Sequence, residues 1–163
     1  MVAEDMEQAN QYLTFQLDDE VFAVEISKVR EVLDFSDVTK VPQTPEFMRG
    51  VINLRGSVVP VVDMRLKFGM DGVEATVNTC IIIVEVIMDG EASVLGSLVD
   101  SVQEVLDIES DQIEPPPRIG TKLNTEFIRG MGKHNEEFVI ILDIDKVFSA
   151  DEISLLQATG TDE

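Results

Sequence analysis

The sequence predicts a mostly β protein, built from two pseudo-repeated SH3-like β-barrels that share a seam, and three observations favour this fold class. Val and Ile together number 36 residues, whereas Ala and Leu number 19, and β-branched side chains favour strands over helices. Short apolar runs are bounded by turn residues, which is typical of hairpins. Several motifs also recur in the same order along the chain, which indicates an internal duplication.

Three hairpins are expected, each with two apolar runs around a polar turn. The runs are 12–17 and 21–24 around Asp18-Asp19-Glu20, 50–54 and 58–62 around Arg55-Gly56-Ser57, and 79–88 and 92–99 around Asp89-Gly90-Glu91. Gly56 is available for a positive φ at the second turn. A further strand is expected from Glu137 to Leu142. Another short strand carries Val29 and Glu31 on one side, with Val32 assigned to the core.

The predicted helices are few and short. Asp63 and Asp143 each precede a segment that can form one helical turn, 64–68 and 144–148, and aspartate is a preferred N-terminal cap. At the C-terminal end, Ser149-Ala150-Asp151-Glu152 has the pattern of a capping box, which predicts a final helix over residues 150–158.

The duplication is visible in three motifs, with offsets of 73 residues for the first and 80 for the other two. They are Val29-Arg30-Glu31-Val32-Leu33 with Val102-Gln103-Glu104-Val105-Leu106, Phe47-Met48-Arg49-Gly50 with Phe127-Ile128-Arg129-Gly130, and Val61-Val62-Asp63 with Ile141-Leu142-Asp143. A repeat of roughly 70 residues is marginal alone, so the copies are expected to share buried surface. We expect barrel 1 over about 10–78 and barrel 2 over about 79–148.

Composition narrows the function classes. The net charge of −20 disfavours nucleic acid and anionic membrane surfaces as partners. The longest unbroken apolar run is the five residues from Cys80 to Val84, far below a membrane span, so no direct membrane insertion is expected. An acidic N-terminal segment without a secretory pattern and a single cysteine are typical of a protein in a reducing cytoplasm.

One segment departs from the acidic average. Residues 28–67 hold seven basic and five acidic residues, whereas residues 68–117 hold eleven acidic residues and no basic one. Ordinary internal ion pairing would explain this segment. A docking face for an acidic partner would explain it equally well, because opposite potentials steer association.

The residues provide little evidence for catalysis. His134 lies in a polar segment, and Cys80 opens an apolar strand without basic neighbours, so neither is expected to be reactive. Asp63 and Asp143 are candidates for a paired-carboxylate site, but their equivalent positions in the repeat favour helix capping. No cofactor, metal site or enzymatic activity is expected.

Arg55 is the strongest candidate for a binding residue. It lies at the tip of a tight hairpin next to Gly56, and a long cationic side chain on a rigid turn is well placed to pair with a partner carboxylate. The alternative is an internal ion pair with Glu31 or Asp63 that locks the seam between the barrels.

Several motifs of the sequence resemble those of a known family. The N-terminal half is similar to the CheW family, the coupling proteins of bacterial chemotaxis, and the resemblance covers about residues 10–157 as a single CheW-like domain. The motifs that carry it are Lys28-Val29-Arg30-Glu31-Val32, Val41-Pro42 to Pro45, Phe47-Met48-Arg49-Gly50-Val51-Ile52-Asn53-Leu54-Arg55-Gly56 and Val59-Pro60-Val61-Val62-Asp63.

The resemblance implies a cytoplasmic, non-catalytic scaffold that is recruited to membrane-associated receptor arrays. Its partners would be the cytoplasmic tip of a chemoreceptor and the regulatory domain of the histidine kinase CheA, with possible self-association in rings. By motif position, the receptor-binding residues would be Val29, Glu31, Gly50, Asn53, Leu54 and Arg55. Gly96 and Gly130 match family glycines near partner-binding surfaces. A small ligand-binding or enzymatic barrel and an acidic nucleic-acid mimic are the alternative functions.

Overall fold

The computed structural model describes residues 11–35, 38–42, 46–88, 90–115, 127–134 and 136–148. Its elements are β1 (Gln11–Leu17), β2 (Glu20–Glu25), η1 (Ile26–Lys28), β3 (Val29–Asp34), β4 (Met48–Leu54), β5 (Ser57–Asp63), α2 (Met64–Lys67), β6 (Cys80–Met88), β7 (Glu91–Val99), β8 (Ser101–Asp107), η2 (Ser110–Gln112), β9 (Ile128–His134), β10 (Glu137–Leu142) and α3 (Ile144–Val147). The three expected hairpins are present as β1–β2, β4–β5 and β6–β7.

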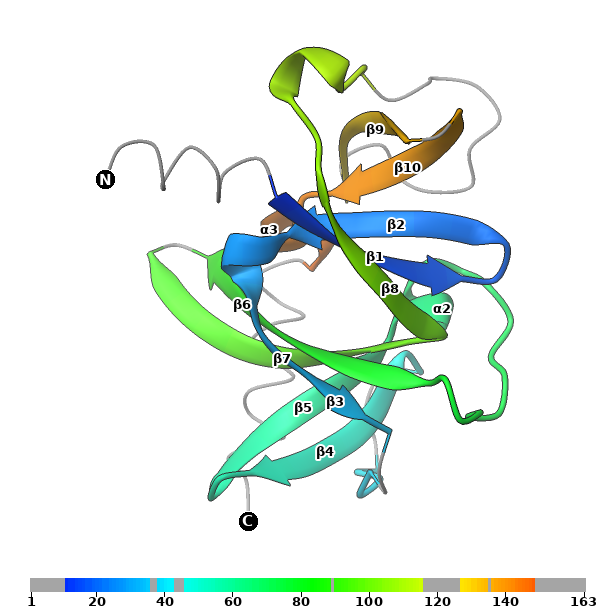
Figure 1. Cartoon of the computed structure of the whole chain (residues 1–163). Helices are drawn as coiled ribbons and strands as arrows, with labels where there is room; N and C mark the ends of the chain where they lie inside the picture. Colours follow the sequence, from blue (N-terminus) through cyan, green and yellow to red (C-terminus); the bar gives the residue numbers. More distant parts are fainter. Residues whose placement is uncertain are drawn as a thin grey trace.

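The described strands form two five-stranded sheets (Figure 1). Sheet A has the order β8-β1-β2-β10-β9 and sheet B the order β3-β6-β7-β5-β4. The orders correspond strand by strand. Each sheet is also bridged at the same place, by Thr39 to Val51 in sheet B and by Glu114 to Met131 in sheet A. The predicted duplication and the predicted mostly β, two-barrel fold are therefore confirmed.

The expected division of the barrels at residue 78 does not match the sheets. Sheet A combines the first hairpin, β1–β2, with β8, β9 and β10, and sheet B combines β3, β4 and β5 with the later hairpin, β6–β7. The chain changes sheet across very short links: η1 joins β2 to β3, and the single residue Asp100 joins β7 to β8. The repeat can be recognised in the sequence. The sequence of these links, however, does not indicate that the chain changes sheet there, so it does not show which hairpin pairs with which strands.

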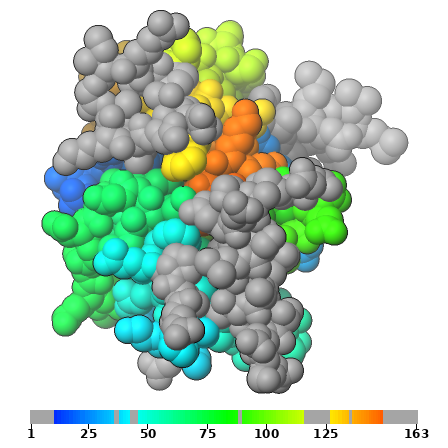
Figure 2. All heavy atoms as spheres, turned by 180° about the vertical axis from the view of Figure 1, so that it is seen from behind, coloured from blue at the N-terminus to red at the C-terminus, as the bar shows by residue number. Residues whose placement is uncertain are grey.

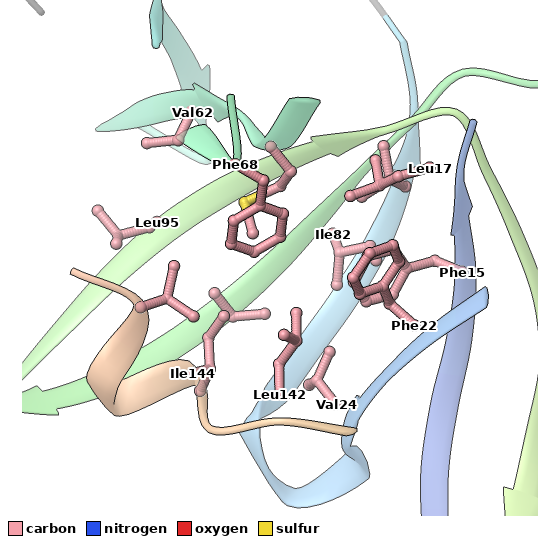
Figure 3. Packing of buried hydrophobic residues seen from close by; sticks show 14 of the residues in the cluster. Phe15, Leu17, Phe22, Val24, Val62, Phe68, Ile82, Leu95, Leu142 and Ile144 are labelled. Atoms are coloured by element: carbon pink, nitrogen blue, oxygen red, sulfur yellow. The ribbon is translucent and has the colours of Figure 1, made fainter. Parts of the chain in front are cut away.

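Among the described residues, three hydrophobic clusters stabilise this arrangement. Sheet A encloses a cluster around Ile141, and sheet B encloses one around Ile83. The largest lies between the sheets and draws side chains from both, including Phe15, Phe22, Val62, Phe68, Ile82 and Leu142 (Figure 3). Neighbouring residues of the central strands thus point alternately into a barrel and into the seam, which explains their nearly continuous apolar sequence.

An aromatic group joins the sheets at the seam. The Phe68 ring lies 5.8 Å from the Phe22 ring and 6.1 Å from the Phe127 ring, measured between centroids. The Lys67 ammonium lies 5.1 to 5.6 Å from the centroids of Phe47, Phe127 and Phe148, within the range of a cation–π contact. Seen from behind, orange atoms near the end of the described chain lie directly against green atoms from its middle (Figure 2).

The short helices follow the expected aspartates, with one difference. Asp63 caps α2, because its carboxylate accepts hydrogen bonds from the amides of Arg65 and Leu66 at 3.0 and 3.3 Å. Asp143 occupies the equivalent position before α3, but its side chain makes no capping bond, so the predicted cap is wrong in this copy. The predicted helix 150–158 lies outside the described residues.

Val32 is a second correction. Its side chain is 41% exposed on the outer face of β3, although the sequence placed it in the core. The burial of β3 alternates, and Val29, Glu31 and Leu33 form its less exposed face. Because Val32 and Leu33 are adjacent apolar residues, this alternation could not be recognised from the sequence.

Ser97 is a weak point of the seam. It is only 4% exposed, and its hydroxyl has no hydrogen-bond partner among the described residues. Its repeat equivalent, 73 positions earlier, is Val24, which packs in the cluster between the sheets.

We expect Ser97→Val to raise the free energy of unfolding by about 1 kcal/mol, because an unsatisfied buried hydroxyl is removed. Urea unfolding measures this gain. A loss with Val but not with Ala would indicate lack of space, and a loss with both variants would contradict the prediction.

An ion pair holds the link between β7 and β8. The Arg65 side chain donates to both carboxylate oxygens of Asp100, from Nε at 2.8 Å and from Nη2 at 2.6 Å. The Asp18 amide also donates to Asp100, at 2.8 Å. Burial alone would raise the pKa of Asp100, but these hydrogen bonds and the attraction of Arg65 hold it below its usual value.

This lowered pKa predicts a specific loss of stability in acid. A carboxyl group with a lowered folded pKa stabilises the protein above its unfolded pKa of about 3.9, and this contribution is lost as the pH falls through the folded value. We expect the stability difference between wild type and Asp100→Asn to be constant above about pH 5 and to shrink below about pH 4. Urea unfolding across this pH range measures it, and a difference that persists unchanged to about pH 2 would contradict it.

Candidate binding groove on sheet B

The turn between β4 and β5 is rigid and fixes the position of Arg55. Arg55 and Gly56 both have positive φ, 52° and 86°, the combination of a type I′ hairpin turn. The Asn53 side chain accepts a hydrogen bond from the Gly56 amide at 3.0 Å. Asn53 is exposed, and its bond stabilises the turn from outside, so the arginine is presented on a defined backbone.

Arg55 forms an internal ion pair with Glu31, which is one of the two internal partners expected from the sequence. The guanidinium donates to both carboxylate oxygens of Glu31, with a distance of 3.0 Å for the Nη2 bond. This hydrogen bond and the charge of Glu31 raise the pKa of Arg55 above its ordinary value. Asp63, the other expected partner, is buried and pairs with Arg49 at 3.3 Å.

The location of this pair is at the surface of one barrel and not at the seam. Glu31 belongs to β3 and Arg55 to the β4–β5 turn, and β3 and β4 are the two end strands of sheet B. The pair therefore joins the two ends of one sheet. The Arg55 side chain remains 75% exposed, whereas that of Glu31 is 24% exposed. Glu31 thus orients a guanidinium that stays accessible to a partner.

A surface groove lies beside this pair. Its lining combines the charged and polar side chains of Arg30, Glu31, Arg55 and Ser57 with the apolar side chains of Leu54, Val59, Ile83 and Val94. Val59 and Ile83 belong to the cluster inside sheet B. The groove therefore has an apolar floor that continues into the barrel, and a charged rim. An apolar floor with few polar groups is typical of binding sites.

The groove brings together three of the six predicted receptor-binding residues, Glu31, Leu54 and Arg55. The other three do not line it. Asn53 stabilises the turn, and Val29 packs against the cluster between the sheets. Gly50 is buried in β4. The sequence reading missed Arg30 and the apolar floor, because Val59, Ile83 and Val94 come from three strands that meet only in the fold.

The remaining predicted glycines have backbone environments that other residues would disturb. A Cβ on Gly96 would lie 2.9 Å from the Ile81 side chain and 3.3 Å from that of Val61, inside sheet B. A Cβ on Gly130 would lie 2.4 Å from the Ile113 side chain, in sheet A. Neither glycine lines the groove, and close packing accounts for both.

Internal ion pairs account for much of the basic segment 28–67. Besides the Arg55 pair, the bonded pairs are Lys28–Asp145 at 2.7 Å, Arg30–Glu85 at 2.6 Å, Arg49–Asp63 at 3.3 Å and Arg65–Asp100 at 2.6 Å. Arg30 and Arg55 nevertheless keep more than half of their side chains exposed, and both line the groove. Internal ion pairing thus explains much of the segment, and the docking face for an acidic partner stays a prediction.

The described residues show neither a metal-binding cluster nor a membrane-spanning helix. No group of three or more His, Cys, Asp or Glu side chains there is placed to hold a metal ion. Within the same residues, none of the helices has the length and apolar character needed to cross a membrane.

Comparison with known proteins identifies the family. Residues 11–152 match the family model described as a CheW-like domain. The chain is 38% identical to Chemotaxis protein CheW of Klebsiella aerogenes over 146 residues, covering 90% of this chain and 86% of that protein. It is 34% identical to Chemotaxis protein CheW of Thermotoga maritima, covering 83% and 85%.

A solved structure agrees with these matches. The crystal structure of scaffolding protein TtCheW from Thermoanaerobacter tengcongensis superposes with a TM-score of 0.78 at 35% identity, covering 88% of this chain and 95% of that one. The two-sheet fold, the repeat and these relatives lead to one conclusion: the chain belongs to the CheW-like family.

Proposed function

We propose that this protein is a non-catalytic scaffold that couples chemoreceptors to a CheA-type histidine kinase in chemotaxis signalling. The support comes from its relatives, which are named chemotaxis proteins, and from a similar structure named a scaffolding protein. The single observation that carries the proposal is the groove on sheet B. It places an accessible arginine on a rigid turn above an apolar floor.

In this proposal the groove receives a helix of the receptor tip. A helix that binds in a groove is recognised through apolar anchors on one of its faces. The half-buried side chains of Leu54 and Val94 offer the complementary surface, above the buried Val59 and Ile83. Burial of those anchors supplies the affinity. Arg55 supplies orientation, because its bonds to Glu31 use two of the five guanidinium N–H donors and others remain for a receptor carboxylate or carbonyl.

The kinase contact is the second part of the proposal. In this proposal the regulatory domain of the kinase contacts one barrel end and alternates with the scaffold in rings. Gly96 and Gly130 are proposed to matter there indirectly, because they permit close packing in the strands behind such surfaces. The protein would act in the cytoplasm, at membrane-associated receptor arrays.

Neither alternative function has a specific observation in its favour. A catalytic pair of Asp63 and Asp143 is disfavoured, since Asp63 is buried, caps α2 and pairs with Arg49. The nucleic-acid mimic has only the net charge of −20 behind it, and five of the carboxylates, those of Glu31, Asp63, Glu85, Asp100 and Asp145, bond to internal cations.

Retention of partners tests the proposal. The tagged wild-type chain is immobilised, lysate of the source cells is passed over it, and the retained proteins are identified. The proposal predicts a chemoreceptor and a CheA-type kinase among them. If neither is retained while the protein is folded, as judged by a cooperative melting transition, the family membership would describe the fold alone.

A further inference from the structure

The two links through which the chain changes sheet are each held by a carboxylate and a cation. At the first, Asp100 alone separates β7 from β8. Arg65 of α2 donates to both oxygens of its carboxylate, which also accepts the Asp18 amide at the end of the β1–β2 hairpin. The Arg65 side chain is only 13% exposed. Three elements, from both sheets, meet in this one contact.

The second link has the same parts. Lys28 ends η1, which separates β2 from β3. Its ammonium pairs with Asp145 of α3 at 2.7 Å. The other oxygen of the Asp145 carboxylate accepts the Ile87 amide near the end of the β6–β7 hairpin, at 2.8 Å. Lys28 and Asp145 are both less than one third exposed.

The repeat relates the helix and hairpin residues of the two contacts, and their charges are reversed. The link residues Lys28 and Asp100 lie 72 positions apart, one less than the offset of the first repeated motif. Asp145 lies 80 positions after Arg65, the offset of the second and third repeated motifs. Ile87 lies 69 positions after Asp18, the offset that superposes β6 on β1 when the paired residues of the two hairpins are matched. The helix carries the cation and the link carries the acid in the first contact, and the opposite holds in the second. In both, a carboxylate accepts the hairpin amide.

We propose that these two contacts are equivalent locks that hold the links between the sheets and thereby fix the barrels relative to each other. A lock needs a helix residue and a link residue of opposite charge, and the cation can lie on either of the two. The carboxylate of the pair must accept the amide at the hairpin end. Partly buried, hydrogen-bonded ion pairs of this kind are costly to break on one side only, because one charge is left without its partner. The inference concerns the fold, so its failure would leave the proposed binding groove untouched.

Reversing the first lock tests this inference. Arg65→Asp and Asp100→Lys are made singly and together, and melting temperatures are measured. Each single variant places two like charges at the link and loses the ion pair, so we expect each to lower the melting temperature by about 5 °C or more. The double variant reproduces the polarity of the second lock, with a helix carboxylate free to accept the Asp18 amide. It is expected to recover most of that loss.

The matched control is the exposed pair of Arg30 and Glu85, which lies at 2.6 Å with 55% and 32% exposed side chains. The same reversal there should change the melting temperature little in any combination, as is usual for surface pairs. If single variants at the first lock do not fold, Arg65→Gln and Asp100→Asn, singly and together, provide the same double-mutant cycle. A double reversal that is as unstable as the sum of its single variants, or a cycle without coupling, would overturn the proposal.

Discussion

Replacing Arg55 by glutamate is expected to abolish retention of the chemoreceptor while the melting temperature stays within a few degrees of wild type. The side chain is 75% exposed, so its pair with Glu31 contributes little to stability, as is usual for surface ion pairs. A glutamate at the hairpin tip would put two carboxylates at the rim of the groove and repel an acidic partner. Reversal of an oriented interface charge reduces affinity by about tenfold or more.

Two control variants make this result specific. Arg129→Glu reverses another exposed arginine, in sheet A, whose side chain is 52% exposed and pairs with Glu25, and this variant should retain the receptor. Arg55→Lys keeps the charge but loses the paired geometry of the guanidinium, so an intermediate affinity is expected. Binding by titration and melting by circular dichroism are measured on all four proteins. An Arg55→Glu protein that unfolds would place Arg55 among the structural residues and contradict the assignment.

Gly50→Ala is expected to cost about 3 kcal/mol or more of folding stability, a magnitude that is exceptional for a single residue. Gly50 has a φ of 147°, and a Cβ at this position would lie 2.1 Å from the Thr39 carbonyl oxygen and 2.8 Å from the Val38 side chain. The contact is to backbone, which also forms the bridge from Thr39 to Val51. The strand must shift or the bridge must open. In a domain of this size the melting temperature should fall by about 10 °C.

The neighbouring glycine of the same hairpin is the matched control for this prediction. Gly56 also has a positive φ, 86°, but no atom lies within 4 Å of its Cβ position. Gly56→Ala is therefore expected to cost only about 1 kcal/mol, from the backbone conformation alone. Equal losses in the two variants would show that close approach to Thr39 is not what Gly50 provides. Weaker receptor binding by Gly50→Ala would follow from the disturbed β4–β5 hairpin rather than from a lost contact.

Much of the fold could be predicted from the sequence because the determining patterns are local. The turn at Arg55 and Gly56 and the cap at Asp63 depend on a few consecutive residues, and the repeat depends on copies of the same motifs. The strand exchange between the two halves could not be predicted in this way. It depends on the three residues of η1 and on Asp100, whose effect on chain direction appears only when the sheets are assembled.

The candidate site likewise has a part that local sequence predicts and a part that only the assembled fold shows. Arg55 and its possible partner Glu31 followed from residue type and from the tight turn, but the choice between Glu31 and Asp63 required the packing of β3 against the rest of sheet B. The apolar floor could not be predicted, since Val59, Ile83 and Val94 lie on different strands. Val32 was misplaced because two adjacent apolar residues on an exposed strand resemble a buried segment.

The most direct test of the central claim is kinase activity in a reconstituted system of receptor, CheA-type kinase and this protein. Phosphate incorporation by the kinase is measured with and without receptor ligand, with wild-type protein, with Arg55→Glu and with no scaffold. The proposal predicts that kinase activity responds to the ligand only with wild type, and that Arg55→Glu behaves like the sample without scaffold. A full ligand response without the scaffold, or an undiminished response with folded Arg55→Glu, would contradict the coupling role assigned to the groove.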